Sequence, residues 1–565
     1  MARLPDGRLF EAPPGTSLAA LLQAAHGGDG WRLHTVAAVL NGRLRELTAP
    51  LDTDADLAPV TTERADGVRI YRRSLVLLLV TAAAEVFPEA EVFIEHSATT
   101  AAGYYCRVQG RAPFSQADLA RIQERMREIV ACDAPFVRST LPVSEAVELF
   151  RARGEHDTSR LLAHRQRESV TLYSLRGRPD FSLGYLVPSA GHLGHFALEA
   201  CPPGFMLRFP HQGRHGEISP PLPYPRLFAV FEEAGRWLNR LGVRGAGALN
   251  DAIVAGRVQE ISLVAEALHE ARISQIAAQI AEGHDRIRAI LVAGPSCSGK
   301  TTFAKRLAVQ LLALGLRPFP LSLDDYFVDR EQTPRDATGR PDYEAFESLD
   351  VALLDRQLLS LMRGETVRLP LYDFVTGTRK PGPEVTLDPD NLLILEGIHG
   401  LNPKLVESLP PERIYRVYVS ALTQLNLDRH NRVSTEDCRL IRRIVRDAAT
   451  RGYPARATLA RWESVTRGEK RHIFPFQEEA DAIFNSALVH ELAVLRPLVE
   501  PLLLQVRPET PEFVEANRIL SFLAWFKPAP THLVPDNSIL REFVGSSILD
   551  EFRLWPRHVG GPNHG

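Results

Sequence analysis

Residues 294–302 read GPSCSGKTT, and this stretch decides the fold of the second half of the chain. It fits the pattern Gly-x4-Gly-Lys-Thr, in which glycines let backbone N–H groups curl around phosphate oxygens and the last hydroxyl, here Thr301, holds Mg²⁺. Lys300 is the first of only six lysines among 66 Lys and Arg residues, and its compact ammonium group suits the cradle better than a planar guanidinium. The pattern predicts a set of residues that bind ATP: Gly294, Pro295, Ser296, Cys297, Ser298, Gly299, Lys300, Thr301 and Thr302.

The flanking residues predict the strand and the helix that such a loop joins. Residues 287–293, IRAILVA, are an apolar and largely β-branched run that predicts a buried strand. After the loop, Phe303, Leu307 and Leu311 fall at helical spacing, and Gly315 is placed to end that helix. These flanks favour a phosphate-binding loop over the alternative, a glycine-bearing turn with a lysine at the helix start.

Length and composition limit the classes of protein. At 565 residues the chain is long enough for three or more domains. A net charge of −3 gives no overall cationic field, so nucleic acid is not expected as the main partner. The five cysteines are scattered, and we expect a reducing cytoplasm and no signal peptide. The longest apolar run, residues 75–84, is too short to span a bilayer and predicts a buried helix, so no membrane partner is expected.

Carboxylates follow two further predicted strands. Residues 318–323 predict a strand followed by Asp324 and Asp325, and residues 392–395 predict a strand that ends at Glu396. Ligands of an open α/β sheet bind beyond the carboxyl ends of its strands. We expect Asp324 to accept the proton of an attacking hydroxyl, and Asp324 and Glu396 to help order Mg²⁺. The alternative is that the two aspartates cap a following helix.

A run of arginines lies in residues 439–452, RLIRRIVRDAATRG, which predict a helix. Transfer of a phosphoryl group needs positive charge on its oxygens and a lid that excludes water, so we expect Arg446 to act in catalysis. Four residues of the run fall on one helical face: Arg439, Arg442, Arg443 and Arg446. The alternative is a solvated basic face that pairs with neighbouring carboxylates: Glu436, Asp437 and Asp447.

These motifs stand in the order found in the uridine kinase and phosphoribulokinase family of P-loop kinases, which this part of the chain resembles. Besides the loop, the motifs are SLDDYF, DYEAFESLD, LPLYDFVTGTRK, LILEGI and RRIVRDAATRG. The resemblance implies a catalytic base at Asp324 and a carboxylate for the ribose hydroxyls at Glu344. It also implies substrate contacts at Tyr372 and Arg379. The nucleotide-binding lid arginines of the family fall at three positions: Arg443, Arg446 and Arg451.

Three residues depart from the family pattern. The uridine kinase motif YDFxxHxR has a histidine that reads the pyrimidine, and Gly377 stands at that place. Tyr453 replaces a further lid arginine, and Glu344 is one methylene longer than the aspartate of the family. We expect phosphoryl transfer to survive these changes. Because a hydrogen-bonding site that loses its donor loses most of its discrimination, the sequence does not identify the acceptor.

The front of the chain resembles another family. In residues 1–64, LPDGRLFEAPPGTSLAALL, VLNGRL and LDTDADLAPVT resemble the TGS domain, a ubiquitin-like β-grasp module of threonyl-tRNA synthetases and stringent-response enzymes. The Asp-Gly and Asn-Gly pairs in LPDG and LNGR predict hairpin turns. Thr16 or Ser17 is expected to cap the helix that begins with LAALL.

Residues 65–211 resemble the second N-terminal domain of threonyl-tRNA synthetase, which in that family removes mischarged serine with a His-x3-His pair and a Cys-x3-His pair. Other residues stand at the four places in this chain: Arg73, Leu77, Ser182 and Leu186. Without imidazole or thiolate there, we expect neither a metal site nor a general base, and we carry over the fold but not the editing activity. His192 and His195 are predicted to be surface or loop histidines.

Together these patterns predict an α/β and α+β multidomain chain. Its expected parts are a TGS-like domain (1–64), a synthetase-like domain (65–211), a linker with helices (212–284), a P-loop kinase-like domain (285–506) and a helical extension (507–565). We expect an ATP- and Mg²⁺-dependent kinase acting on a primary hydroxyl of a nucleoside or other ribose-containing small molecule. The alternative is a regulatory protein whose front binds RNA or a nucleotide effector and whose P-loop domain is a switch; an oligomer is possible in either case.

Overall fold

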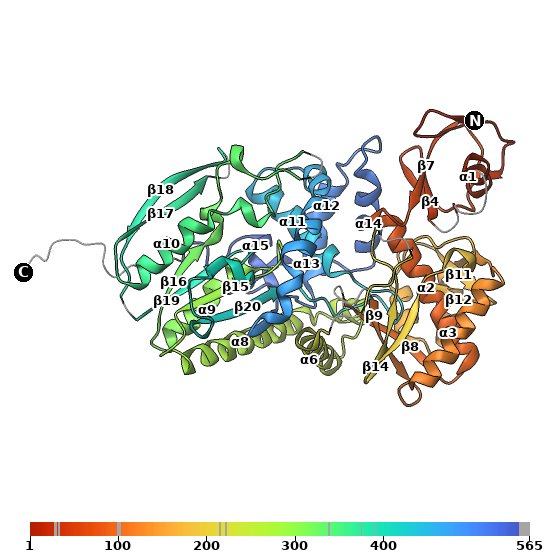
Figure 1. Cartoon of the computed structure of the whole chain (residues 1–565). Coiled ribbons are helices and arrows are strands. Elements are labelled where there is room, and N and C mark those ends of the chain that lie inside the picture. The colour runs from red at the N-terminus through yellow and green to blue at the C-terminus, as the bar shows by residue number, and fades with distance from the viewer. Residues whose placement is uncertain are drawn as a thin grey trace, which may run out of the picture.

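Figure 1 shows the chain as a computed structural model, in which the front modules lie to one side of a sheet with its surrounding helices. The structure describes residues 1–26, 31, 34–98, 103–213, 216–220, 223–336, 339–373, 376–388 and 390–552. Parts of the predicted linker and of the predicted extension, residues 553–565 among them, lie outside this set. Within it, no helix is both long and apolar enough to cross a membrane. The predicted α/β and α+β multidomain class is confirmed.

A five-stranded parallel sheet forms the centre of the second half. Its order is β16-β19-β15-β20-β21, and every neighbouring pair is parallel. The central strand β15 (Ala289–Ala293) is buried along its whole length, which explains the continuous apolar sequence. The other strands are β16 (Arg317–Ser322), β19 (Asn391–Glu396), β20 (Ile414–Ser420) and β21 (Ala482–Asn485).

Helices α9 and α11 carry the predicted phosphate loop and the arginine run. α9 (Lys300–Ala313) begins at the predicted lysine, and Phe303, Leu307 and Leu311 are fully buried, as their spacing predicted. The arginines lie on α11 (Thr435–Thr450). Further elements of this half are α10 (Val351–Met362), α12 (Ala455–His472), α13 (Glu491–Leu503) and the hairpin β17 (Val367–Asp373) with β18 (Thr378–Val385).

The first module is a small β-grasp fold with strand order β2-β1-β7-β4-β5. Asn41 and Gly42 join β4 to β5, so the predicted hairpin forms there. The Ser17 hydroxyl accepts the N–H of Ala20, so Ser17 is the capping residue of α1 (Leu18–His26). The strands are β1 (Ala2–Arg3), β2 (Leu9–Phe10), β4 (Thr35–Leu40), β5 (Arg43–Arg45) and β7 (Ala55–Thr61), with a short pair β3 (Thr16–Ser17) and β6 (Pro50–Leu51).

The second module packs helix α2 (Ala65–Val86) among two antiparallel sheets. α2 is buried from Leu75 to Ala83, as the apolar run predicted. One sheet is β13 (Ala197–Cys201), β14 (Gly204–Arg208), β9 (Gly103–Gln109) and β8 (Glu91–Ala98); the other is β10 (Phe136–Pro142), β11 (Ser169–Leu175) and β12 (Arg178–Phe181). The remaining helices are α3 (Gln116–Ala131), α4 (Val143–Ala152) and α5 (His156–Ala163).

Helices of the linker and of the C-terminal segment hold the parts together. α8 (Val258–Glu282) packs on α9, where Arg306 pairs with Glu266 and Glu270. α14 (Phe513–Leu523) lies beside the front modules (Figure 1), and its Glu515 accepts hydrogen bonds from Arg69 of α2. The other helices are α6 (Pro225–Leu241), α7 (Ala246–Val254) and α15 (Arg541–Val544).

The loop between β20 and α11, residues 421–434, is buried against the second module. The Asn426 amide donates to the Ile94 carbonyl at 2.9 Å. His430 Nδ1 lies 2.7 Å from Asp180 Oδ2, and both side chains are almost fully buried. Because buried polar pairs are costly to separate, this loop fixes the second module to the second half of the chain.

Candidate functional site

Two arginines of α11 brace the phosphate loop from behind. Arg439 pairs with Glu469 of α12, and the same carboxylate accepts the N–H of Ser296 at 2.9 Å. Arg439 and Arg442 donate to the carbonyls of Ser296 and Cys297 at 3.1 and 3.4 Å. Both guanidinium groups are buried. These two residues keep the predicted helical face, but they form internal ion pairs with Glu469 and Glu491, because this part of α11 packs into the protein.

Three other arginines stand around the buried carboxylate of Asp447. Arg443, Arg446 and Arg451 lie 3.4, 3.6 and 3.5 Å from its oxygens. Arg443 also donates to the Ser296 hydroxyl at 3.0 Å, which places it at the loop. The structure thus brings together the three residues that the family motif assigns to the lid.

Lys300, Thr301 and Glu396 meet at the start of α9. The ammonium nitrogen of Lys300 lies 4.0 Å from Glu396 Oε1, and the Thr301 hydroxyl donates to Glu396 Oε2 at 3.2 Å. Burial raises the pKa of Glu396 to about 7 against the charge of Lys300, and Asp324 adds to the rise. Because burial raises its pKa despite the nearby lysine, Glu396 is suited to bind a further cation.

Asp324 and Asp325 have different surroundings. Ser322 caps the turn after β16 by accepting the N–H of Asp324, so the Asp324 side chain is not needed as a cap. Asp325 accepts the N–H of Tyr372 at 3.1 Å and holds the β17 hairpin. Burial raises the pKa of Asp324, and three nearby cations oppose that rise: Lys300, Arg451 and Arg446. Asp324 thus lies within electrostatic reach of both the loop and the lid.

Glu344 stands on the side where an acceptor is expected. Its side chain lies against Gly468 of α12. Among the residues that the structure describes, its buried Oε2 has no hydrogen-bond partner. Burial raises the pKa of Glu344 to about 7, and the Glu469 carboxylate adds to the rise. A buried carboxyl oxygen that lacks an internal partner is suited to a hydroxyl of a ligand.

The residues expected to contact a base are engaged within the protein. Gly377 has φ of +72°, and a Cβ there would collide with the Arg330 side chain. The Tyr372 ring packs on Phe327, with centroids 5.7 Å apart. Arg379 forms a 2.9 Å ion pair with the aspartate that caps α10, so its charge is neutralised internally. Residue 377 itself thus offers no side chain to a base, and the Arg330 guanidinium lies in the space beside it.

The donor set at the loop fits a magnesium nucleotide. Lys300 and the N-terminus of α9 suit phosphate oxygens. The Thr301 hydroxyl and the carboxylates of Asp324 and Glu396 suit Mg²⁺, which binds one or two carboxylates and completes its shell with phosphates and water. Across the described ranges, no group of three His, Cys, Asp or Glu residues could hold a metal ion alone, so the phosphates would have to supply further ligands.

Two carboxylates that contact the loop lie outside the sequence motifs, so sequence reasoning did not find them. Glu469 braces Ser296 from α12. Glu542 of α15, in the predicted helical extension, accepts a hydrogen bond from the Thr302 hydroxyl at 3.1 Å. Both reach the loop through tertiary packing rather than through local sequence.

The place of the synthetase's editing residues is filled. Leu77 and Leu186 are buried apolar side chains. Arg73 donates to a backbone carbonyl next to Ser182. Asn431, from the loop between β20 and α11, bonds the backbone on both sides of Ser182 at 3.0 Å. We propose that this filled position around Ser182, called the editing-type pocket below, holds the two halves of the protein together and has no editing activity.

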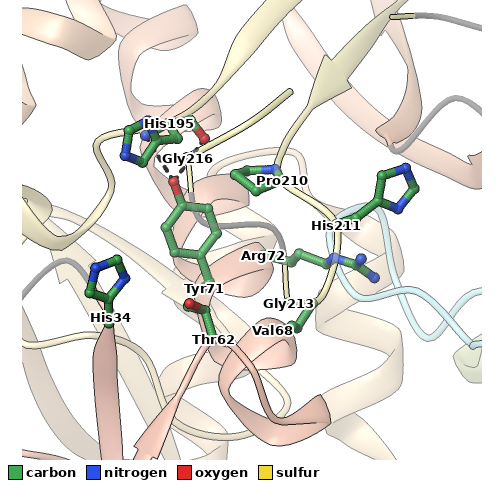
Figure 2. A pocket seen from close by; sticks show the side chains of 10 residues that line it. All are labelled: His34, Thr62, Val68, Tyr71, Arg72, His195, Pro210, His211, Gly213 and Gly216. Atoms are coloured by element: carbon green, nitrogen blue, oxygen red, sulfur yellow. Dashed lines mark hydrogen bonds between the residues drawn. The ribbon is translucent and has the colours of Figure 1, made fainter. Parts of the chain in front are cut away.

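A small cavity lies where the first two modules meet, lined by His34, Tyr71 and His195 among others (Figure 2). The Tyr71 hydroxyl donates to the carbonyl of His195 and accepts its N–H, at 2.8 and 3.0 Å. The cavity volume of about 30 Å³ leaves room for no more than a few water molecules. His192, predicted at the surface or in a loop, is instead buried edge-on to Trp31.

The fold and the site define a P-loop domain with a carboxylate beside the loop lysine and an arginine lid. Residues 289–493 match the model of the phosphoribulokinase / uridine kinase family. The match runs from β15 into α13 and includes Lys300, Asp324, Glu396 and the lid arginines. The chain therefore carries a P-loop kinase domain of this family.

The N-terminal region is similar to threonine–tRNA ligases. The chain is 35% identical over 196 residues to that of Acidovorax sp. (strain JS42), covering 34% of this chain and 30% of the ligase. It is 36% identical over 198 residues to that of Hahella chejuensis, with the same coverage of 34% and 30%. The chain thus spans about 30% of the length of these curated relatives. A solved structure described as a possible uridine kinase, from Bacillus stearothermophilus, is 21% identical and covers 35% of this chain and 88% of that one; its TM-score of 0.24 supports no further argument.

Proposed function

We propose that the protein is an ATP- and Mg²⁺-dependent kinase that transfers the γ-phosphoryl group to a primary hydroxyl of a nucleoside or other ribose-containing small molecule. The observation that carries this proposal is the meeting of Lys300, Asp324 and Glu396 at the ends of three neighbouring strands. A nucleotide-binding switch needs the lysine and the metal-side carboxylate, but it does not need a second carboxylate with a raised pKa between the loop and the lid.

Each of these residues has a role in the transfer. Lys300 and the loop N–H groups bind phosphates, while Thr301 and Glu396 would hold Mg²⁺, which would supply positive charge to the phosphates. Asp324 takes the proton of the acceptor hydroxyl as the oxygen–phosphorus bond forms and the bond to ADP breaks. Arg446 offsets the charge on the transferred group, and the lid excludes water.

Glu344 binds the sugar of the acceptor in this proposal. Its unpartnered buried oxygen can accept a ribose hydroxyl, which replaces a lost hydrogen bond to water. The part of the site that would contact the nucleobase of the acceptor is less constrained, since Gly377 carries no side chain and Arg379 is already paired. Uridine is the default acceptor, and a sugar without a base fits the same hydroxyl-binding groups.

The test is ADP release from Mg²⁺-ATP in the presence of a panel of nucleosides and sugars, with the product identified by mass spectrometry. We expect at least one ribose-containing acceptor to raise ADP release well above the rate without acceptor. Equal ADP release with every member of the panel would contradict the proposal.

A regulatory protein that binds RNA or a nucleotide effector is the second candidate. It is favoured by the buried loop between β20 and α11, through which the second module contacts the base of the lid helix. In that case ATP would change the affinity of the front for its effector, and the effector would change the affinity for ATP by the same factor. RNA that co-purifies with the protein and responds to ATP, without any acceptor-dependent turnover, would identify this function.

A further inference from the structure

The C-terminal segment, residues 530–549, lies on the phosphate loop. Its Ile539 is fully buried and packs on Gly299, a loop glycine with φ of +85°. Lys305, on the second turn of α9, donates to the carbonyl of Leu549 at 2.7 Å. The segment is therefore held by the loop and by the helix that follows it.

Glu542 brings a carboxylate from this segment to the anion-binding groups of the loop. It accepts the Thr302 hydroxyl at 3.1 Å and lies 3.8 Å from Arg446. One internal carboxylate thus contacts a residue of the phosphate loop and a residue of the lid, two groups placed to bind phosphate.

The position of Glu542 is fixed by packing on both sides of it. Leu540 is fully buried, and the buried Phe543 ring lies 5.1 Å from the guanidinium carbon of Arg442, the arginine that braces the loop. Ser538 donates to Glu266 of α8 at 2.5 Å. Because its neighbours in the chain are anchored in this way, the backbone at Glu542 is fixed beside the loop, and the carboxylate is a built feature of the site.

We propose that Glu542 is an internal competitor of the nucleotide: its carboxylate takes the place of a phosphate, and residues 538–549 must move away from the loop before ATP binds. This proposal rests on the proposed function, because it assumes that the loop binds ATP. Like charges brought together in a buried site repel strongly, so the carboxylate and a triphosphate do not share the loop. Part of the binding energy of ATP is then used to displace the segment, which lowers the apparent affinity.

The substitution Glu542→Gln tests the charge while keeping the size and the hydrogen bond to Thr302. The full chain and the variant are titrated with a fluorescent ATP analogue and Mg²⁺. We expect the Kd of the variant to fall by about tenfold or more. The control is Glu551→Gln, the same change at an exposed residue two positions beyond the segment, which should leave the Kd within about twofold. An unchanged Kd in Glu542→Gln overturns the proposal, and a higher Kd would make Glu542 a nucleotide-binding residue instead.

Hydrogen–deuterium exchange of the unsubstituted protein gives a readout that does not depend on how a variant folds. Added Mg²⁺-ATP should slow exchange in residues 294–302 and speed it in residues 538–549. Slower exchange in both segments would show that the segment closes over the nucleotide, which overturns the proposal but leaves the proposed function intact. If neither the unsubstituted protein nor the variants bind the analogue, and exchange at residues 294–302 does not change with Mg²⁺-ATP, both the displacement and the kinase assignment are wrong.

Discussion

The phosphate loop and the editing-type pocket differ in how their polar groups are placed. At the loop, burial raises the pKa of Asp324 and Glu396, and Glu344 keeps an oxygen without a partner in the described part of the chain. At the editing-type pocket, Arg73 and Asn431 bond the backbone beside Ser182. An unpaired buried oxygen beside the phosphate loop indicates a place for a ligand. At the editing-type pocket the Arg73 Nε also lacks a partner in the described part of the chain, but Leu77 and Leu186 fill the space, which indicates a contact that holds the modules together.

The strongest test of this difference is Asp324→Asn. We expect acceptor-dependent kcat to fall by about 10²–10⁴-fold, because the amide cannot take the proton, while the affinity for the ATP analogue stays within a few-fold. The matched control is Asp325→Asn, which keeps an acceptor oxygen for the Tyr372 N–H and should change kcat far less. Full activity in Asp324→Asn would remove Asp324 from the reaction.

Asn431→Ala tests the other side of the comparison. The substitution leaves the Leu183 N–H and the Phe181 carbonyl without their partner, so we expect a loss of roughly 2–4 kcal/mol of unfolding free energy, measured by urea denaturation. Gln424→Ala, in the same loop, is the control and should cost much less. Equal losses in the two variants would mean that the pocket does not hold the modules together.

The pH dependence of stability tests whether Glu344 is an unpaired carboxyl. Its pKa is raised from 4.5 to about 7 in the folded protein, so the fold binds this proton more tightly than the unfolded chain does. The resulting stability is fully present below about pH 4 and is lost as the pH rises through 7. As the pH rises from 5 to 8 without ligand, the unfolding free energy of Glu344→Gln should therefore fall by about 2 kcal/mol less than that of the unsubstituted protein. The exposed Glu347→Gln should follow the unsubstituted curve, and a Glu344→Gln curve that does the same would contradict this account.

Arg73→Ala should have the smallest effect of these substitutions. Burial lowers the pKa of Arg73 to about 10, and its visible contact is to a backbone carbonyl, so we expect a cost of about 1 kcal/mol in stability and less than a twofold change in kcat/KM. A tenfold loss of kcat/KM, measured with the acceptor from the screen, would show that the editing-type pocket takes part in the kinase reaction.

Local patterns were enough to predict the elements that carry the site. The loop motif, the apolar strand and the helical spacing are short-range features, and β15, α9 and α11 form where they indicate. The Asn41-Gly42 hairpin is predictable for the same reason, since a two-residue turn of this kind is set by its own residues. The roles of Asp324, Glu344 and the lid arginines stay predictions, although the structure brings these residues to one place.

Contacts between distant segments could not be predicted in this way. Glu469 meets the loop across 173 positions of the chain, and Glu542 meets it across 240. Helical spacing shows that Arg439 and Arg446 share a face of α11, but not that part of this face is packed against α12 and the loop. His192 is likewise buried by Trp31 of another module, which its own neighbours in sequence do not reveal.

The late position of Glu542 also matters while the protein is being made. The ribosome synthesises the chain from its N-terminus, so the loop at residues 294–302 and all five strands of the sheet exist before residues 538–549 leave the exit tunnel. Until Glu542 has emerged, the segment cannot compete for the loop, so by the displacement proposal a nascent chain would hold ATP more tightly than a chain in which the segment is docked.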